Sequence, residues 1–261
     1  LFTSPHLVTY RERIQVNGQC ISELDVSELI EQVVPISEAR GHSFFETTWA
    51  IAAEYFRIQR VEIVVWEVGL GGRLDATNVC EPIGSIITNV ALDHTAILGE
   101  SLPEIAAEKA PIFRQGKPAL TGDASTQVLL SNATDVEVEL VSMDRVVNTA
   151  LVGAHQRINV SVAMALLDRL QIRFDSEALM DFSVPARLER IDDIVIDCAH
   201  NPHSLNIALA QIPLLERQDS RPLELVFGVM SDKAVGPMSA LIRNTQLPVH
   251  LVEPNYPRRL A

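Results

Sequence analysis

The sequence predicts an α/β fold with a mostly parallel sheet, and three observations lead to this prediction. Short runs rich in β-branched residues alternate with amphipathic helical segments along the whole chain. Several of the runs are continuously apolar, which is typical of strands buried on both faces of a parallel sheet. The length of 261 residues permits one large domain or two ordinary ones.

The helices are predicted from apolar residues at helical spacing and from their start signals. Ser22 and Asp25 form a capping box ahead of the first helix, and Asn201 or Pro202 can start a later one. The predicted helices cover residues 23–40, 44–60, 102–115, 155–171, 204–216 and 234–243.

The strands are predicted from runs of Val, Ile and Leu that are too short to be helices. Buried strands are expected at 61–68, 83–90, 191–197 and 223–229, and shorter strands at 118–121, 136–141 and 249–252. In parallel sheets, ligands bind beyond the carboxyl ends of the strands, so the residues that follow each run are candidates for a site.

A domain boundary is expected near residues 183–187, because this stretch carries a proline and precedes a new βαβαβ pattern. The predicted domains are residues 1–184 and 185–261.

The composition excludes several classes of protein. The net charge of −13 argues against a nucleic-acid partner, which needs a basic face. No apolar run approaches the roughly 18 residues that a transmembrane helix needs. Three cysteines without a Cys-x-x-Cys pair indicate reduced thiols and a cytoplasmic protein.

The most informative segment is residues 67–78, Glu-Val-Gly-Leu-Gly-Gly-Arg-Leu-Asp-Ala-Thr-Asn. A predicted buried strand ends in Glu67, and the glycines that follow allow the backbone to approach a ligand closely. The segment is not a dinucleotide fingerprint, because Leu74 stands where that motif needs glycine. The alternative is a plain β-turn with a solvated glutamate.

Other polar groups also follow predicted strands or begin predicted helices. His94 is a candidate metal ligand or a structural histidine, and Lys109 is one of only three lysines, which ordinarily extend to solvent. Gln156 and Asn159 share one helix face near a helix start, which suits a purine edge or an anion; a plain polar helix start is the alternative. Asp197 closes another apolar run.

Together these segments resemble the folylpolyglutamate synthase/dihydrofolate synthase family of the Mur ligase superfamily. Residues 3–7 resemble its Ser-Pro-His-Leu folate-site motif, and residues 67–78 match its signature without a gap. Residues 91–94, 108–113, 153–159, 185–187, 197–202 and 232–233 follow in the family's order. The resemblance implies a P-loop-NTPase-like domain with a mostly parallel sheet, and a smaller Rossmann-like C-terminal domain of the Mur ligase type.

The resemblance also implies roles for individual residues. Magnesium would be held by Glu67, His94 and a carbamylated Lys109. The folate side would comprise Ser4, Pro5, His6, Phe45, Asp75 and Ala76. The nucleotide side would comprise Gln156, Asn159, Arg187 and Asp197. The catalytic candidates are Lys109, Arg187 and His200.

The implied reaction joins L-glutamate to dihydropteroate or to a reduced folate with ATP, through an acyl phosphate. Mg²⁺ is the expected cofactor, and the partners are these small molecules, with no nucleic acid, no membrane and a monomeric enzyme.

Three features depart from the family. None of the lysines is followed by Ser or Thr, so the chain shows no P-loop; the family's P-loop precedes the Ser-Pro-His-Leu motif and is therefore expected before Leu1. The tail after Arg259 is shorter than the resemblance implies, so the C-terminal domain is expected to be truncated. The family's Pro-Gly-Arg is Pro185-Ala186-Arg187 here. The alternatives are a peptidoglycan Mur-type ligase and a catalytically dead relative that binds folate.

Overall fold

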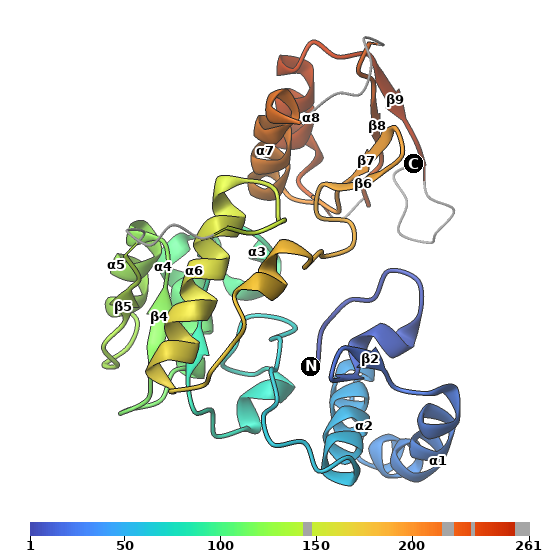
Figure 1. Ribbon diagram of the computed structural model, residues 1–261, viewed down its shortest axis with the longest axis vertical. Coiled ribbons are helices and arrows are strands. Elements are labelled where there is room, and N and C mark those ends of the chain that lie inside the picture. Colours follow the sequence, from blue (N-terminus) through green and yellow to red (C-terminus); the bar gives the residue numbers. More distant parts are fainter. Residues whose placement is uncertain (143–147, 216–221, 231–232, 254–261) are drawn as a thin grey trace. The chain divides into compact units, whose positions relative to one another are not determined.

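The computed structural model describes residues 1–142, 148–215, 222–230 and 233–253. These residues form two compact units, each described by itself below (Figure 1). Unit 1 comprises Leu1–Val90 and His94–Leu140, and unit 2 comprises Ala91–Asp93 and the residues from Val141 onward. The units divide about 40 residues before the domain boundary predicted at 184/185, because the 154–169 helix groups with the C-terminal elements.

Unit 1 begins with a helical hairpin on a small antiparallel sheet. Its elements are η1 (Tyr10–Arg13), β1 (Gln15–Val16), β2 (Gln19–Cys20), α1 (Glu23–Ala39) and α2 (Phe44–Ile58). The Ser22 hydroxyl accepts the Asp25 N–H at the start of α1, and Ser43 forms a capping box with Glu46 at the start of α2. Both helices therefore begin where the sequence predicts them.

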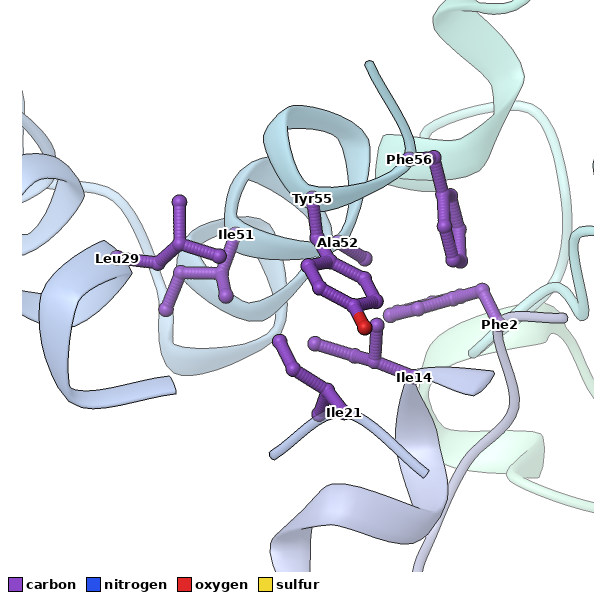
Figure 2. Close-up of a cluster of buried hydrophobic side chains, with 8 residues drawn as sticks. All are labelled: Phe2, Ile14, Ile21, Leu29, Ile51, Ala52, Tyr55 and Phe56. Carbon is purple, nitrogen blue, oxygen red and sulfur yellow. The ribbon is translucent and has the colours of Figure 1, made fainter. Parts of the chain in front are cut away.

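The core of this part is an apolar cluster between the two helices and the first strands (Figure 2). Leu29 of α1 lies against Ile51 of α2, and the rings of Phe2 and Phe56 both pack against that of Trp66. Phe2, Ile14 and Ile21 are fully buried, and each buried side chain of this size contributes about 1.5–3 kcal/mol to stability.

The rest of unit 1 is a three-stranded parallel sheet with its helices. Its elements are η2 (Ala76–Val79), β3 (Ser85–Ile86), α3 (Thr95–Leu98), α4 (Leu102–Lys109), η3 (Ala110–Ile112), β4 (Ala119–Thr121), α5 (Ala124–Ser131) and β5 (Glu139–Leu140). The strand order is β3-β4-β5, with Ser85 opposite Ala119 and Leu120 opposite Glu139. A second core forms around buried Ala106, Ala110, Phe113 and Leu130.

Unit 2 contains α6 (Ala154–Arg169), η4 (Glu177–Met180), β6 (Glu189–Ile191), β7 (Ile194–Ile196), α7 (Pro202–Gln211), η5 (Ile212–Leu214), β8 (Leu225–Phe227), α8 (Val235–Asn244) and β9 (Val249–Leu251). Strands β8 and β9 are parallel, and α7 and α8 pack beside them around Leu205 and Met238 (Figure 1). A cavity of about 660 Å³ lies between α8 and these two strands. No residue predicted for the site lines it.

The α/β class with parallel sheets is confirmed. The predicted helices appear as α1, α2, α4, α6, α7 and α8, with ends that differ by up to six residues; the predicted end at residue 216 lies outside the described residues. Each of the predicted strands at 83–90, 118–121, 136–141, 223–229 and 249–252 contains two or three strand residues.

The prediction of a buried strand at residues 61–68 was wrong. Within the described part of the chain, this run pairs only with Phe2, which donates its N–H to Val65 and accepts that of Glu67. A buried strand needs neighbours on both edges and cover on both faces. Ile63 and Val65 instead keep 51% and 61% of their surface exposed.

The prediction of a single buried strand at 191–197 was also wrong. Ile191 and Ile194 face each other across an antiparallel hairpin, and Asp192 at its tip adopts a φ of 52°. An Asp-Asp pair between apolar residues favours such a turn, because aspartate tolerates the left-handed region. The isoleucines of this hairpin remain exposed.

All three cysteines are free thiols. No helix in the described residues combines the length and the apolar character needed to cross a membrane.

Candidate active site

The glycine-rich segment 67–78 is held in shape by one carboxylate. Asp75 Oδ2 accepts the backbone N–H groups of Gly69 and Leu70, each at 3.0 Å. Its other oxygen accepts the Thr77 N–H at 2.9 Å and the Thr77 hydroxyl at 2.6 Å, which caps η2. Asp75 therefore folds the turn, and Ala76 follows it as the first residue of η2. The ligand role predicted for these two residues stays a prediction.

Glu67 joins this segment to the predicted folate loop. Its Oε2 accepts the Thr3 hydroxyl and, at 2.7 Å, the Ser4 N–H. Ser4 precedes Pro5 through a cis peptide bond, and His6 follows. The structure thus brings Ser4 and Glu67 together, although the sequence separates them by 63 residues.

Phe45 packs against the same segment. A Cβ added to Gly69 would lie 2.6 Å from the Phe45 ring and 3.1 Å from Asp75 Oδ2, so only glycine fits here. The Phe45 ring also meets that of Phe2 edge-on, with a centroid separation of 5.7 Å. Two predicted folate residues, Phe45 and Asp75, therefore flank one glycine.

The C-terminal end of α4 docks on the other glycines of the segment, which places Lys109 beside it. A Cβ added to Gly72 would lie 2.9 Å from the Lys109 carbonyl oxygen. The Arg73 N–H donates to the Glu108 carbonyl at 2.8 Å, and its guanidinium forms an ion pair with the Glu108 carboxylate at 2.9 Å. Lys109 itself is half-buried at the last position of α4.

His94 belongs to the same unit. It is the exposed N-cap of the short α3, where its φ of 49° lies in the left-handed region. Leu98 at the end of α3 contacts Gly71, since a Cβ added there would lie 2.9 Å from the leucine Cδ2. All the predicted metal and folate residues therefore lie in unit 1.

In unit 2, the backbone folds around Asp197. Its two carboxylate oxygens accept the N–H groups of Leu188 at 3.0 Å and Ala199 at 2.8 Å. Ala186 stands at the position of the family's glycine and adopts a φ of 52°, a conformation that only glycine reaches without strain. The Ala186 carbonyl accepts the Cys198 N–H at 2.9 Å.

His155 lies within electrostatic range of several polar and charged side chains of this unit. Burial lowers the pKa of its imidazole, the Asp197 carboxylate acts against this, and Arg187 and His203 lower the pKa further. The predicted nucleotide residues Arg187 and Asp197 are therefore close enough to His155 to act on its charge. His155, which was not predicted as a site residue, shares this cluster.

The other predicted residues of unit 2 mark two helix starts. On α6, Asn159 Nδ2 donates to Gln156 Oε1 at 3.2 Å, as expected of neighbours on one face. Before α7, His200 Nδ1 lies 2.9 Å from the Cys198 carbonyl oxygen, and His200 is exposed.

Three polar residues near the predicted site were missed by the sequence analysis as site residues. Asn201 caps α7 through the Ser204 N–H, and its Nδ2 donates to Asp93 Oδ2 at 2.7 Å. Lys233 Nζ lies 4.0 Å from Asp93 Oδ1. All three groups lie in unit 2 and come from segments that the sequence analysis singled out, but no spacing rule joins residues that stand 108 positions apart.

The donor groups of unit 1 fit a magnesium ion that keeps part of its own hydration. The described residues hold no group of three or more His, Cys, Asp or Glu side chains placed to bind a metal. Mg²⁺ needs no such group, because proteins usually hold it through one or two carboxylates, water and substrate phosphates. Glu67 suits this arrangement, since the described residues engage only its Oε2.

Comparison with known proteins identifies the family. The chain is 30% identical to the dihydrofolate synthase/folylpolyglutamate synthase of Bacillus subtilis over 98% of its own length and 70% of the relative's. It is 33% identical to a probable bifunctional folylpolyglutamate synthase/dihydropteroate synthase of Haloferax volcanii, and this match covers 91% of the chain but only about a third of that protein. No family model matches the chain.

Solved structures agree with the sequence relatives. A structure of Escherichia coli FolC in complex with DHPP and ADP matches all of the chain and 69% of its own, with a TM-score of 0.86 and 26% identity. A bifunctional folylpolyglutamate synthase/dihydrofolate synthase with Mn, AMPPNP and L-glutamate bound matches with a TM-score of 0.83, 29% identity and the same coverage. The fold is an α/β fold of the Mur ligase type. The chain belongs to the folylpolyglutamate synthase/dihydrofolate synthase family.

Proposed function

We propose that the protein carrying this chain is an ATP-dependent ligase that adds L-glutamate to dihydropteroate, to folate polyglutamates or to both. One observation carries the proposal. Ser4, Glu67, Phe45, Asp75 and Lys109 come from four distant stretches of sequence, and they gather around the segment that matches the family's signature. Relatives with DHPP, ADP, AMPPNP and L-glutamate bound support the choice of substrates.

The reaction has two steps in this proposal. A carboxylate oxygen of the folate substrate attacks the γ-phosphorus of ATP, which gives an acyl phosphate and ADP. The amine of glutamate then attacks the acyl carbon, the amide forms, and inorganic phosphate leaves. Both steps need positive charge near the transferred phosphoryl group and partners held in line.

Unit 1 supplies the folate side. Phe45 and the Asp75-Ala76 turn would contact the pterin, and Ser4, Pro5 and His6 would form the loop beside it. Glu67 already receives hydrogen bonds from Thr3 and Ser4, which fix the orientation of its carboxylate.

The divalent metal of the family is proposed to be Mg²⁺, bound by Glu67 and His94. When bound, it neutralises charge on the phosphoryl group during transfer. Lys109, proposed to react with CO₂ to form a carbamate and release a proton, would offer oxygen atoms in place of an ammonium group. The ammonium form of Lys109 would repel the metal, whereas a carbamate is negatively charged and offers the oxygen ligands that Mg²⁺ prefers.

Unit 2 supplies the nucleotide and glutamate side. Gln156 and Asn159 would face the adenine, Asp197 the ribose and Arg187 the phosphates, while His200 would lie near the incoming glutamate. We further propose that the enzyme is a cytoplasmic monomer that takes only these small molecules as partners.

A ligand test separates this proposal from a Mur-type ligase. Dihydropteroate should raise the melting temperature of the full-length protein, because ligands that bind only the folded state stabilise it. A UDP-muramyl peptide substrate should leave the melting temperature unchanged. A shift with the UDP-muramyl compound alone would transfer the assignment to the Mur type, and a shift with dihydropteroate but no turnover would favour a catalytically dead folate binder.

A further inference from the structure

Arg13 is a buried cation to which the function proposed above gives no role. Of the residues that the structure describes, it alone is both charged and buried, with 8% of its surface exposed. It forms no ion pair with a described carboxylate. Its guanidinium carbon instead lies 5.5 Å from the centroid of the Phe44 ring. A buried charge without a counter-ion is costly, so it is retained where it has another task.

The acidic residue beside Arg13 is already engaged. The Glu12 carboxylate accepts the backbone N–H groups of Leu7, Val8 and Thr9 at 2.7–2.9 Å. The amide hydrogen bonds from Leu7 and Thr9 lower the pKa of Glu12, so it stays ionised while it holds this loop. The Glu12 carboxylate thus holds the loop backbone and does not form an ion pair with Arg13.

Arg13 acts on His6. Its Nε donates to His6 Nδ1 at 2.8 Å. A guanidinium has no acceptor, so His6 Nδ1 must be the acceptor and the proton of the neutral ring must be on Nε2. The contact therefore selects one tautomer, in which the free edge of the ring is a hydrogen-bond donor.

The surroundings of His6 suit a flat, polar ligand. Its ring meets Tyr10 edge-on at 6.4 Å, and Tyr10 meets Phe44 edge-on at 6.2 Å. Phe44 has 65% of its surface exposed, so its ring is accessible to a ligand. The same loop is tied to the signature segment through Ser4 and Glu67.

We propose that Arg13 is a positioning residue of the folate side, resting on the function proposed above. It holds His6 as the Nε2–H tautomer, so that the loop presents a hydrogen-bond donor to an oxygen acceptor, carbonyl or carboxylate, of the folate-type substrate. Arg13 itself does not take part in the transfer of the phosphoryl group.

The first readout is the tautomer itself. A long-range ¹H–¹⁵N spectrum of the full-length protein, with His6 assigned from His6→Gln, should show the ring neutral and protonated only at Nε2. Arg13→Met should give a mixture of tautomers. Arg11→Met is the matched control, because Arg11 lies on the same η1 and contacts Ile21 and Glu23 instead of His6.

The second readout is ligand affinity. Arg13→Met should weaken dihydropteroate binding by about tenfold, as expected when the hydrogen bond from His6 Nε2–H to the substrate is lost. Nucleotide binding should stay unchanged. If Arg13→Met melts below the assay temperature, Arg13→Gln, which keeps a donor at the same place, provides both readouts and should retain most of the Nε2–H tautomer.

A proton on His6 Nδ1 in the wild type, or an unchanged tautomer in Arg13→Met, would overturn the proposal. Equal weakening of dihydropteroate and nucleotide binding would also overturn it, because that result indicates a purely structural arginine. Failure of the wild type to bind dihydropteroate would instead reject the proposed function, and the tautomer spectrum would still decide whether Arg13 controls His6.

Discussion

At the scale of single residues, the carboxylates of the site divide into two kinds. In Asp75 and Asp197, both carboxylate oxygens accept hydrogen bonds from backbone N–H groups. Substitution of either aspartate would therefore disturb a turn as well as the binding of any ligand. Glu67 receives its bonds on one oxygen and is exposed. Glu67 therefore allows the clearest separation of chemistry from folding.

Glu67→Gln should lower turnover of the full-length enzyme by about 10–100-fold at limiting magnesium, because the amide keeps an acceptor for Thr3 and Ser4 but loses the charge that holds a metal. Its unfolding free energy should change by less than about 0.5 kcal/mol, as for other exposed positions. Glu62→Gln, an exposed change on the same stretch, is the control. Near-normal turnover of Glu67→Gln would remove Glu67 from the metal site.

Ala186→Gly should stabilise unit 2 by about 0.5–1 kcal/mol, because alanine is strained at a φ of 52° and glycine is not. Ala208→Gly, inside α7, should destabilise by a similar amount. Urea unfolding measures both changes. A loss of stability in Ala186→Gly would mean that the left-handed backbone conformation is not the reason for the family's glycine at this position.

His155 should make stability depend on pH. Its pKa in the folded state lies below the ordinary 6.5, mainly because it is partly buried, so the unfolded chain binds more protons in this range. Stability should therefore fall as the pH drops below about 6.5, and it should fall less in His155→Gln. The two proteins are compared by urea unfolding from pH 8 to pH 5. Parallel curves would show that the histidine is not held neutral.

At the scale of elements, the signature segment works as a docking surface. Its glycines admit the Phe45 ring, Leu98 of α3 and the last turn of α4 at distances that a side chain would block. The signature segment therefore has a structural role, in which its glycines allow α2, α3 and α4 to pack against it, in addition to the ligand contacts proposed for it.

Gly72→Ala tests this docking. The new Cβ would meet the Lys109 carbonyl oxygen at 2.9 Å and the Ile112 side chain at 2.7 Å, and a backbone atom cannot easily move. Such overpacking should cost about 1–3 kcal/mol and should also reduce turnover by displacing Lys109. Gly236→Ala on α8, where nothing lies within 4 Å, should be neutral or slightly stabilising. Similar effects of the two changes would contradict the docking role.

Six of the eight α-helices in the described residues could be predicted from sequence because their signals are local, whereas α3 and α5 were not predicted. Ser22 and Ser43 cap the positions where α1 and α2 begin, and the apolar spacing follows within a few residues. The strands could not be predicted as well, because a strand depends on partners. Residues 61–68 look like a buried strand, yet they pair with a single residue, and the Asp192-Asp193 turn splits another run in two.

The site was predictable where a motif is continuous and not where it depends on packing. The 67–78 segment carries its own glycines and Asp75, so its importance is visible in sequence. Arg13 carries no such signal, since its burial and its contact with His6 exist only in the fold. The same holds for Asn201 and Asp93.

At the scale of the whole molecule, the proposed function assigns different substrates to the two units. Unit 1 holds the residues proposed for folate and metal, and unit 2 those proposed for the nucleotide and glutamate. A ligase needs both sets, because the acyl phosphate formed on one substrate must be attacked by the other.

The most direct test of this account is transfer of isotope-labelled L-glutamate by the full-length protein. With ATP, Mg²⁺ and dihydropteroate or a reduced folate, the label should appear in a product one glutamate heavier than the acceptor, and one ADP should form for each amide. Omission of either ATP or the folate substrate should abolish the product. Label incorporated into a UDP-muramyl peptide, or ADP formed without any glutamate product, would contradict the account.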